Sequence, residues 1–456
     1  MSNRKTLPGT LVVLASAMLL AIWPLPGTMA IRHLLLLIGC VAALLVIKDN
    51  IPALISRSAW PVHLLLLFFV WLLVHYKLLA HNPEEQWREL TGDWLRTFFA
   101  TLIGIALSII LTRPERHLPL QLNRHLQSVL IAGFSGTITI FCARYAYEIW
   151  QTGDWIHWRF YMTPYLGKTP LVIFGSIFLP MLFIKLLQVF TKKEEPHWYF
   201  WGILGISGTL LTYYFGDTKN GFAVFALLLL VFLVRALMLV QGNLQPMKKY
   251  GIYAFLVASV VLSGFVIKAH LQANPSWLNL VADYRISVQI DKHTNWKDRV
   301  APYPLNEYGQ TAHASTYERV SWARAGLDLL KENPLGYGQI NHSFGALAIQ
   351  KWSDFHRPDG INRGSTHSGW LDFALGFGIP GLLLVCIPLA VSYWRARKRS
   401  DFWSTYAVWT IPVIAFTYLI TEVCTGHFIE LLFFLTALFA GLTIRKGPSA
   451  TAAHDG

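Results

Sequence analysis

Long apolar segments separated by short polar connections make up most of the chain. They fall near residues 9–24, 31–47, 59–79, 94–112, 126–148, 168–191, 199–216, 220–241, 251–268, 369–394, 403–424 and 428–444. A helix needs roughly 20 predominantly apolar residues to cross a bilayer, and these segments approach that length. The pattern therefore predicts an all-α polytopic membrane protein with about twelve transmembrane helices.

Basic residues gather on alternate connections between the apolar segments. Examples are Arg4 and Lys5, Lys192 and Lys193, Lys248 and Lys249, and the cluster at 395–399. Because cytoplasmic connections carry an excess of Lys and Arg, these connections and both termini are expected to be cytoplasmic. The net charge of +13 is then mainly a topology signal. No nucleic-acid-binding module is recognisable.

The composition agrees with a membrane protein, since 54% of the residues are hydrophobic and 14% are charged. The four cysteines are dispersed without metal-ligand spacing, which indicates small core residues. The first apolar segment also has features of a cleavable signal peptide, with "GTMA" after it. The alternative is that "PLPGTMA" forms a hairpin between two spans. The remaining topology is the same in both cases.

One connection is far longer than the rest and runs from about residue 269 to residue 367. The alternation of basic clusters puts it outside the cytoplasm. The expected organisation is transmembrane helices 1–9 in 1–268, a loop domain in 269–367, helices 10–12 in 368–446 and a cytoplasmic tail in 447–456. Since this loop holds most of the mass outside the membrane, we expect the functional residues there.

A helical pattern stands inside the loop, in "STYERVSWARAGLDLLKENPLGYG". Ser315 and Glu318 have the spacing of a capping box, and Asn333 followed by proline supplies a stop. The sequence therefore predicts an amphipathic helix that is followed by tight turns in "PLGYG".

Four residues on one face of this helix are Arg319, Trp322, Ala323 and Gly326. This arrangement presents an arginine beside an aromatic ring on a surface that packs closely against another segment. Two simpler explanations of Arg319 remain open, an ion pair with an acid and snorkelling toward lipid headgroups.

Three other cations stand on outer connections. Lys219 lies in the tight turn "FGDTKNGF", Arg159 lies among aromatic residues in "DWIHWRFYMTPYLGK", and Arg144 lies four residues before Glu148. The simpler explanations are an interfacial aromatic belt around Arg159 and a structural ion pair for Arg144.

His367 stands directly before the apolar pattern of "THSGWLDFALGFGIPGLLL". An imidazole with an ordinary pKa near ~6.5 is mostly neutral at pH 7 and can accept a proton from a hydroxyl nucleophile. Capping of the following helix explains the same residue. The outer cations suit a phosphate or diphosphate group, and no metal-ligand or cofactor motif is present, so neither a metal nor a cofactor is expected.

These motifs resemble the signature of the O-antigen ligase and polymerase family. "THSGWLDFALGFGIPGLLL" is similar to its histidine motif before a transmembrane helix, and "RVSWARAGLDLLKENPLGYG" is similar to its Arg-x-x-Trp helix. The resemblance implies a fold like that of C-type glycosyltransferases, with about twelve spans and one large periplasmic loop that contains short helices.

By this resemblance His367 corresponds to the family's essential histidine and Arg319 to its loop arginine. The family's outward Arg turn corresponds to Thr218-Lys219-Asn220-Gly221, where lysine replaces arginine. Lysine keeps the charge but loses the bidentate fork, so Lys219, Arg159 or Arg144 binds the diphosphate. Ser368 stands where the family usually has asparagine.

The resemblance implies an O-antigen ligase of the bacterial inner membrane. It transfers polysaccharide from undecaprenyl diphosphate to lipid A-core at the periplasmic face by inverting, metal-independent transfer, with His367 as the general base. An O-antigen polymerase is the nearest alternative. A protein O-oligosaccharyltransferase is disfavoured by the short C-terminal tail. A lipid or polysaccharide transporter explains the spans without His367, but transporters tend to show repeats and midplane charges, which this sequence lacks.

Overall fold

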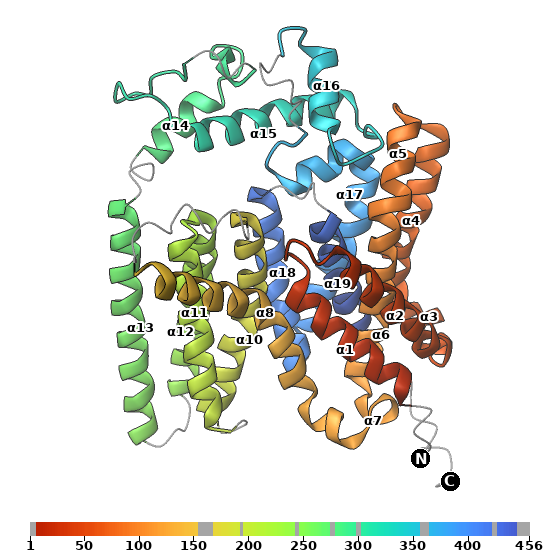
Figure 1. Ribbon diagram of the computed structural model, residues 1–456, viewed down its shortest axis with the longest axis vertical. Coiled ribbons are helices and arrows are strands. Elements are labelled where there is room, and N and C mark those ends of the chain that lie inside the picture. The colour runs from red at the N-terminus through yellow and green to blue at the C-terminus, as the bar shows by residue number, and fades with distance from the viewer. Residues whose placement is uncertain are drawn as a thin grey trace. The chain divides into compact units, whose positions relative to one another are not determined.

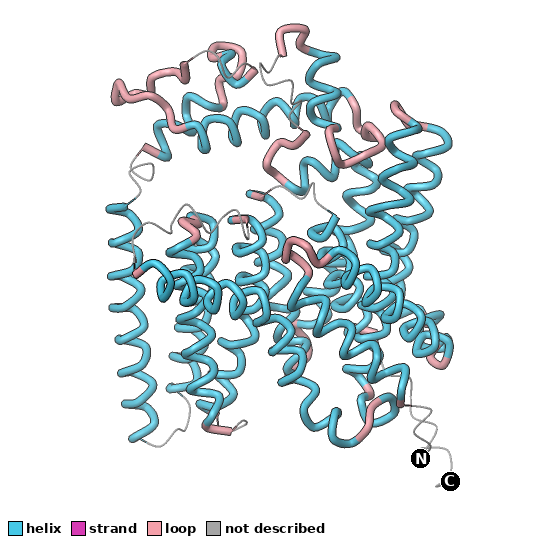
Figure 2. Tube along the Cα trace, in the orientation of Figure 1, coloured by secondary structure: helices cyan, strands magenta, loops and turns pink. Residues whose placement is uncertain are grey.

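The regular structure of the described residues is entirely helical. A computed structural model of the chain describes residues 6–153, 167–191, 195–241, 246–273, 279–297, 302–355, 364–421 and 426–444. Figure 2 shows that helices and loops account for these ranges and that no strand is present in them. The predicted all-α class is confirmed.

A helix stands at each of the predicted spans. These helices are α1 (Leu7–Ile22), α2 (Met29–Lys48), α4 (Trp60–Leu78), α6 (Leu95–Thr112), α8 (Leu120–Thr152), α10 (Lys168–Phe190), α11 (His197–Phe215), α12 (Lys219–Gln241), α13 (Pro246–Ala273), α17 (Gly369–Ala396), α18 (Phe402–Ile420) and α19 (Gly426–Leu442). Within the described residues, eight helices are long and apolar enough to cross a membrane, while α1 and α19 are shorter apolar helices. The protein is therefore a multi-pass membrane protein.

Short helices connect these spans. They are α3 (Ile51–Ile55), α5 (Pro83–Glu89), α7 (Pro114–His117), α14 (Leu280–Ser287), α15 (Ala314–Glu332), α16 (Ser343–Lys351) and the single turns η2 (Arg57–Ala59), η3 (Leu90–Trp94) and η5 (Thr294–Trp296). Helices α14, α15 and α16 belong to the long loop, as predicted. The boundaries expected at residues 268 and 367 concern membrane topology and stay predictions, and the expected tail 447–456 lies outside the described residues.

The chain forms two compact units. Unit 1 comprises 1–137, 380–412 and 425–456, and unit 2 comprises 138–379 and 413–424. In unit 1, α6 packs against α19 and α2, and α1 packs against α2 (Figure 1). In unit 2, α10 packs against α11 and α12.

Within unit 2 the long loop has an apolar core around α15, to which Leu371 and Leu375 of α17 also contribute. Trp322 is buried there, and its Nε1 donates a hydrogen bond to the carbonyl of Trp296 over 3.0 Å. The Tyr317 hydroxyl likewise donates to the carbonyl of His293 over 2.9 Å. Because both polar groups are satisfied, two large aromatic side chains are buried without an unpaired donor.

The predicted helix is confirmed, but the predicted capping box is wrong. The N-cap of α15 is His313, and its backbone N–H donates to Asp283 Oδ2 on α14 over 3.0 Å. Ser315 Oγ instead lies 2.9 Å from His313 Nδ1, and Glu318 Oε1 accepts from the Tyr303 hydroxyl over 2.7 Å. A carboxylate distant in sequence therefore orders the start of this helix in place of Ser315 and Glu318.

Backbone pairing joins the segment after α15 to a break inside α17. Tyr337 N donates to the Leu375 carbonyl over 2.8 Å, and Ile379 N donates to the Pro334 carbonyl over 2.9 Å. Helical geometry fails at Phe377 and at Gly378, where φ is 72°. Two of the sequence motifs, "PLGYG" and "GFGIPG", thus pack on each other backbone to backbone.

We predict that Gly378→Ala destabilises the protein more than Gly309→Ala. Both glycines have positive φ, but a Cβ at Gly378 would overlap the Leu335 backbone, whereas a Cβ at Gly309 meets nothing within 4 Å. With φ of 72° and ψ of 179°, Gly378 lies in a backbone region that is essentially restricted to glycine and costs other residues about 1–3 kcal/mol, and overpacking adds about 1–3 kcal/mol there. Thermal unfolding in detergent measures the difference, and equal melting temperatures would contradict close packing at the break.

Candidate active site

His367 sits in a strained turn at the start of α17. Its φ is +61°, a left-handed conformation that is uncommon for residues other than glycine. Strain of this kind costs about 1–3 kcal/mol and persists only where surrounding contacts hold the backbone. Contacts on both sides of His367 must therefore hold its backbone in this conformation.

Asp372 holds this turn. The carboxylate is fully buried, and its Oδ1 accepts from Thr366 N over 2.6 Å and from Thr366 Oγ1 over 2.7 Å. Ser368 N in turn donates to Thr366 Oγ1 over 3.2 Å. Asp372 also lies in the first turn of α17, where the helix dipole favours a negative charge. The residues that flank His367 are thus fixed by one carboxylate.

Helix α15 packs on the same turn. The Trp322 ring lies 5.6 Å from the His367 ring, centroid to centroid. A Cβ added at Gly326 would come within 2.8 Å of both Thr366 Cγ2 and Leu371 Cδ2, so a larger residue there would force these side chains to move. The predicted close-packing face of α15 is confirmed, and Arg319 is exposed one turn before Trp322.

The turn that carries Lys219 is tied to the segment beside His367. Asn220 Nδ2 donates to the carbonyl of Ile420 over 3.3 Å. Gly369 N donates to the carbonyl of the next residue, Thr421, over 2.8 Å. Adjacent carbonyls at the end of α18 therefore hold the start of α12 and the start of α17.

Positive charge gathers around Lys219, which is half-buried at the N-terminus of α12. Its charge interacts with those of Arg319 and Lys168, and with the opposite charge of Asp217. Lys168 Nζ lies 3.3 Å from Asp217 Oδ2. Two of the predicted site residues, Lys219 and Arg319, are thus electrostatic neighbours. Their like charges favour an anion between them.

His313 is a second histidine near these charges. Burial lowers the pKa of His313, and the Lys219 charge lowers it further, while Asp283 and Asp217 act in the opposite direction. The imidazole is accordingly neutral at pH 7, where it adds no charge to the cation group. No sequence motif singled it out, because its neighbours come from α12 and α14.

Of the other two predicted cations, only Arg144 lies within the described residues. Arg144 forms an ion pair with Glu148 and lies over the Tyr147 ring, 5.5 Å from its centroid. The ion pair expected from the i, i+4 spacing is therefore present, and it occupies part of the guanidinium. Arg159 lies outside the described residues.

Sequence reasoning missed Asp372 and Thr366. Asp372 stands five residues after His367 in the same motif, and an acidic residue in an apolar span is itself a signal of function. Its partner Thr366 becomes evident only from the turn geometry. Among the described residues, no group of three or more His, Cys, Asp or Glu is placed to hold a metal ion.

A family model matches part of the chain. Residues 202–386 match the family model described as O-antigen ligase, and this range contains Lys219, Arg319, His367 and Asp372. No curated protein matches the chain.

We predict that Asp372→Ala destabilises the fold by about 1–3 kcal/mol, because it removes the acceptor of the buried Thr366 N and leaves Thr366 Oγ1 only the longer bond of 3.3 Å to the Ser368 carbonyl. Asp328→Ala is the control, since Asp328 makes only surface ion pairs with Arg324 and Lys331, which are worth about 0–1 kcal/mol. Thermal unfolding of the two purified variants measures the difference. Similar melting temperatures would show that Asp372 does not hold the turn.

Proposed function

Because residues 202–386 match the family model described as O-antigen ligase, we propose that the protein ligates a polysaccharide to a lipid-linked acceptor at the non-cytoplasmic surface of the membrane. The family match supports a glycosyltransferase of the O-antigen ligase or polymerase type. The proposed donor is undecaprenyl-diphosphate-linked polysaccharide, and the proposed acceptor is a sugar hydroxyl of lipid A-core. The proposed location is the bacterial inner membrane, with both termini in the cytoplasm and the long loop in the periplasm.

The observation that carries this proposal is the grouping of two cations beside a histidine turn. Arg319 and Lys219 interact electrostatically, and Trp322 on the helix of Arg319 contacts His367. A diphosphate leaving group needs positive charge where its own charge develops. A hydroxyl nucleophile needs a nearby base. These groups supply both requirements from unit 2 alone.

In the proposed reaction the acceptor hydroxyl oxygen attacks the anomeric carbon of the donor sugar. The bond between that carbon and the diphosphate oxygen breaks, and its electron pair leaves with the diphosphate. His367 takes the hydroxyl proton as general base. Attack opposite the leaving group inverts the anomeric configuration. Arg319 and Lys219 stabilise the released diphosphate, and no step requires a metal ion.

Hydrogen bonds on both sides of His367 support the proposal that it acts as the base. Asp372 fixes the residue before it through Thr366 N, and Thr421 fixes the segment after it through Gly369 N. A base that is held in one orientation loses less entropy when the acceptor arrives. The strained φ of +61° at His367 is then the structural cost of aiming the imidazole.

We predict that His367→Asn abolishes transfer without unfolding the protein. Asparagine tolerates the left-handed conformation better than other residues, but it cannot act as a general base. The matched control is His342→Asn, because His342 also has positive φ, 67°, and also precedes a helix. The assay uses reconstituted membranes with lipid-linked polysaccharide, lipid A-core and a chelator.

Three outcomes of this assay are informative. Transfer by wild type and His342→Asn but not by folded His367→Asn supports the ligase with His367 as base. Transfer by His367→Asn at the wild-type rate would exclude that role. Chain lengthening on the polyprenyl carrier, without transfer to lipid A-core, would identify a polymerase.

We predict that Lys219→Gln lowers transfer about tenfold or more, while Lys219→Arg retains it. The expected loss corresponds to one charge-assisted interaction of about 1.5–3 kcal/mol. Arginine restores the charge and adds the bidentate fork. Initial rates at several donor concentrations measure the effect. Normal transfer by Lys219→Gln together with loss in Arg144→Gln would assign the diphosphate to Arg144 instead.

A further inference from the structure

Unit 1 contains a polar cavity that the proposed reaction does not use. Its volume is about 150 Å³, and the side chains that line it include Arg32, His33, Arg96, His427 and Glu430. One water molecule needs only about 10–15 Å³ of such volume, so the cavity has room for a small polyatomic group. All of these residues belong to unit 1, whereas His367, Arg319 and Lys219 belong to unit 2.

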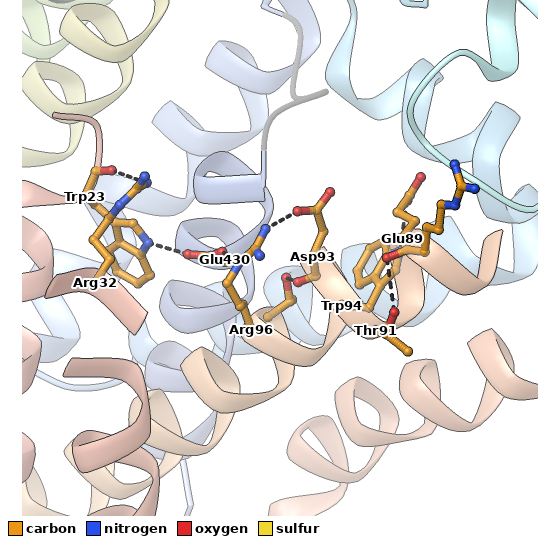
Figure 3. A network of polar contacts seen from close by, with 10 residues as sticks. Trp23, Arg32, Glu89, Thr91, Asp93, Trp94, Arg96 and Glu430 are labelled. Atoms are coloured by element: carbon orange, nitrogen blue, oxygen red, sulfur yellow. Dashed lines mark hydrogen bonds and ion pairs between the residues drawn. The ribbon is translucent and has the colours of Figure 1, made fainter. Parts of the chain in front are cut away.

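The carboxylates around the cavity already have donors. Figure 3 shows Glu430 between Trp23 and Arg96. Trp23 Nε1 donates to Glu430 Oε2 over 2.6 Å, and Arg96 Nε donates to Glu430 Oε1 over 2.8 Å. Arg96 Nη2 also pairs with Asp93. The Glu430 carboxylate therefore has a donor on each of its oxygens, and a bound cation would have to compete with Arg96.

Two nitrogen atoms around the cavity have no hydrogen-bond partner. Arg32 Nη1 donates to the Trp23 carbonyl over 2.8 Å, but Arg32 Nε is buried without a hydrogen-bond partner. His427 Nε2 is also buried without a partner. Within the part of the chain that the structure describes, Arg32 forms no ion pair with a carboxylate. Since an unpaired buried donor costs about 1–3 kcal/mol, an acceptor in the cavity would relieve this cost.

Two helix N-termini face the same cavity and reinforce the preference for an anion. Arg32 lies in the first turn of α2, which begins at Met29, and His427 is the second residue of α19. The free N–H groups and the dipole of a helix N-terminus favour negative charge. Met29 and Gly426, the first residues of these helices, both line the cavity.

We propose that this cavity binds a phosphate group. A phosphate oxyanion has several acceptor oxygens and negative charge, which match the unpaired Arg32 and His427 nitrogens and the two helix N-termini. The phosphate belongs either to the headgroup of a membrane lipid or to free phosphate in solution. The proposal does not depend on the transfer reaction, because it concerns residues of unit 1 only.

Binding to the full-length protein in a maltoside detergent tests the proposal. The probes are dihexanoyl phosphatidylglycerol, dihexanoylglycerol without phosphate, and inorganic phosphate. The melting temperature at increasing probe concentration gives an apparent Kd, because a ligand that binds the folded state stabilises it. Arg32→Gln is expected to weaken phosphate binding about tenfold or more, since it removes a charged donor.

Two further variants make the test specific. Arg88→Gln is the control, because Arg88 is exposed and pairs with Glu84 at the surface. It should bind like wild type. Glu430→Gln removes a negative charge from the cavity and should tighten phosphate binding, whereas a purely structural network would show no gain. Because Glu430→Gln should change the affinity in the opposite direction to Arg32→Gln, it tests the proposal even if Arg32→Gln fails to fold.

The probes distinguish the sources of phosphate. Binding of phosphatidylglycerol but not inorganic phosphate identifies a lipid headgroup site, and binding of both identifies a site open to free phosphate. Both results support the proposal if Arg32→Gln weakens and Glu430→Gln tightens the binding. An equal effect of dihexanoylglycerol, or unchanged binding in both variants, would overturn it.

Discussion

The backbone pairing between 334–338 and the break in α17 is the interaction on which the arrangement of the site depends. Tyr337 and Gly338 donate to the carbonyls of Leu375 and Gly376, and Ile379 donates back to Pro334. These bonds anchor the end of α15 to the same helix that begins beside His367. The distance between the arginine helix and the histidine turn is thereby set by main-chain hydrogen bonds, which tolerate little displacement.

This constraint explains why so many special backbone positions cluster in one part of unit 2. Gly378 has positive φ at the break in α17, and Gly326 lets α15 approach Thr366. His367 has a left-handed conformation next to Thr366, whose N–H donates to Asp372. Each feature alone costs stability or demands one residue type. Together they place the His367 imidazole beside the Trp322 ring on the helix that carries Arg319.

Much of the fold could be predicted from the sequence, because long apolar segments are a local signal of membrane-spanning helices. The helix of Arg319 and its end at Asn333 were also predictable from local stop signals. Its start was not, since Asp283 supplies the cap from another helix. The hydrogen bonds from Thr366 to Asp372 depend on the turn at His367, and the sequence pattern does not reveal the geometry of that turn. Likewise, the cavity in unit 1 unites Arg32, Arg96 and Glu430, which are far apart in the chain.

In the proposed reaction Arg319 and Lys219 hold the donor diphosphate beside His367. An experimental structure of the full-length protein with a lipid-linked diphosphate sugar bound would locate the diphosphate. We expect phosphate oxygens in contact with both cations and the anomeric carbon on the side of His367. A diphosphate bound without contact to Arg319 or Lys219, for example in the Arg32 cavity of unit 1, would refute this placement of the donor.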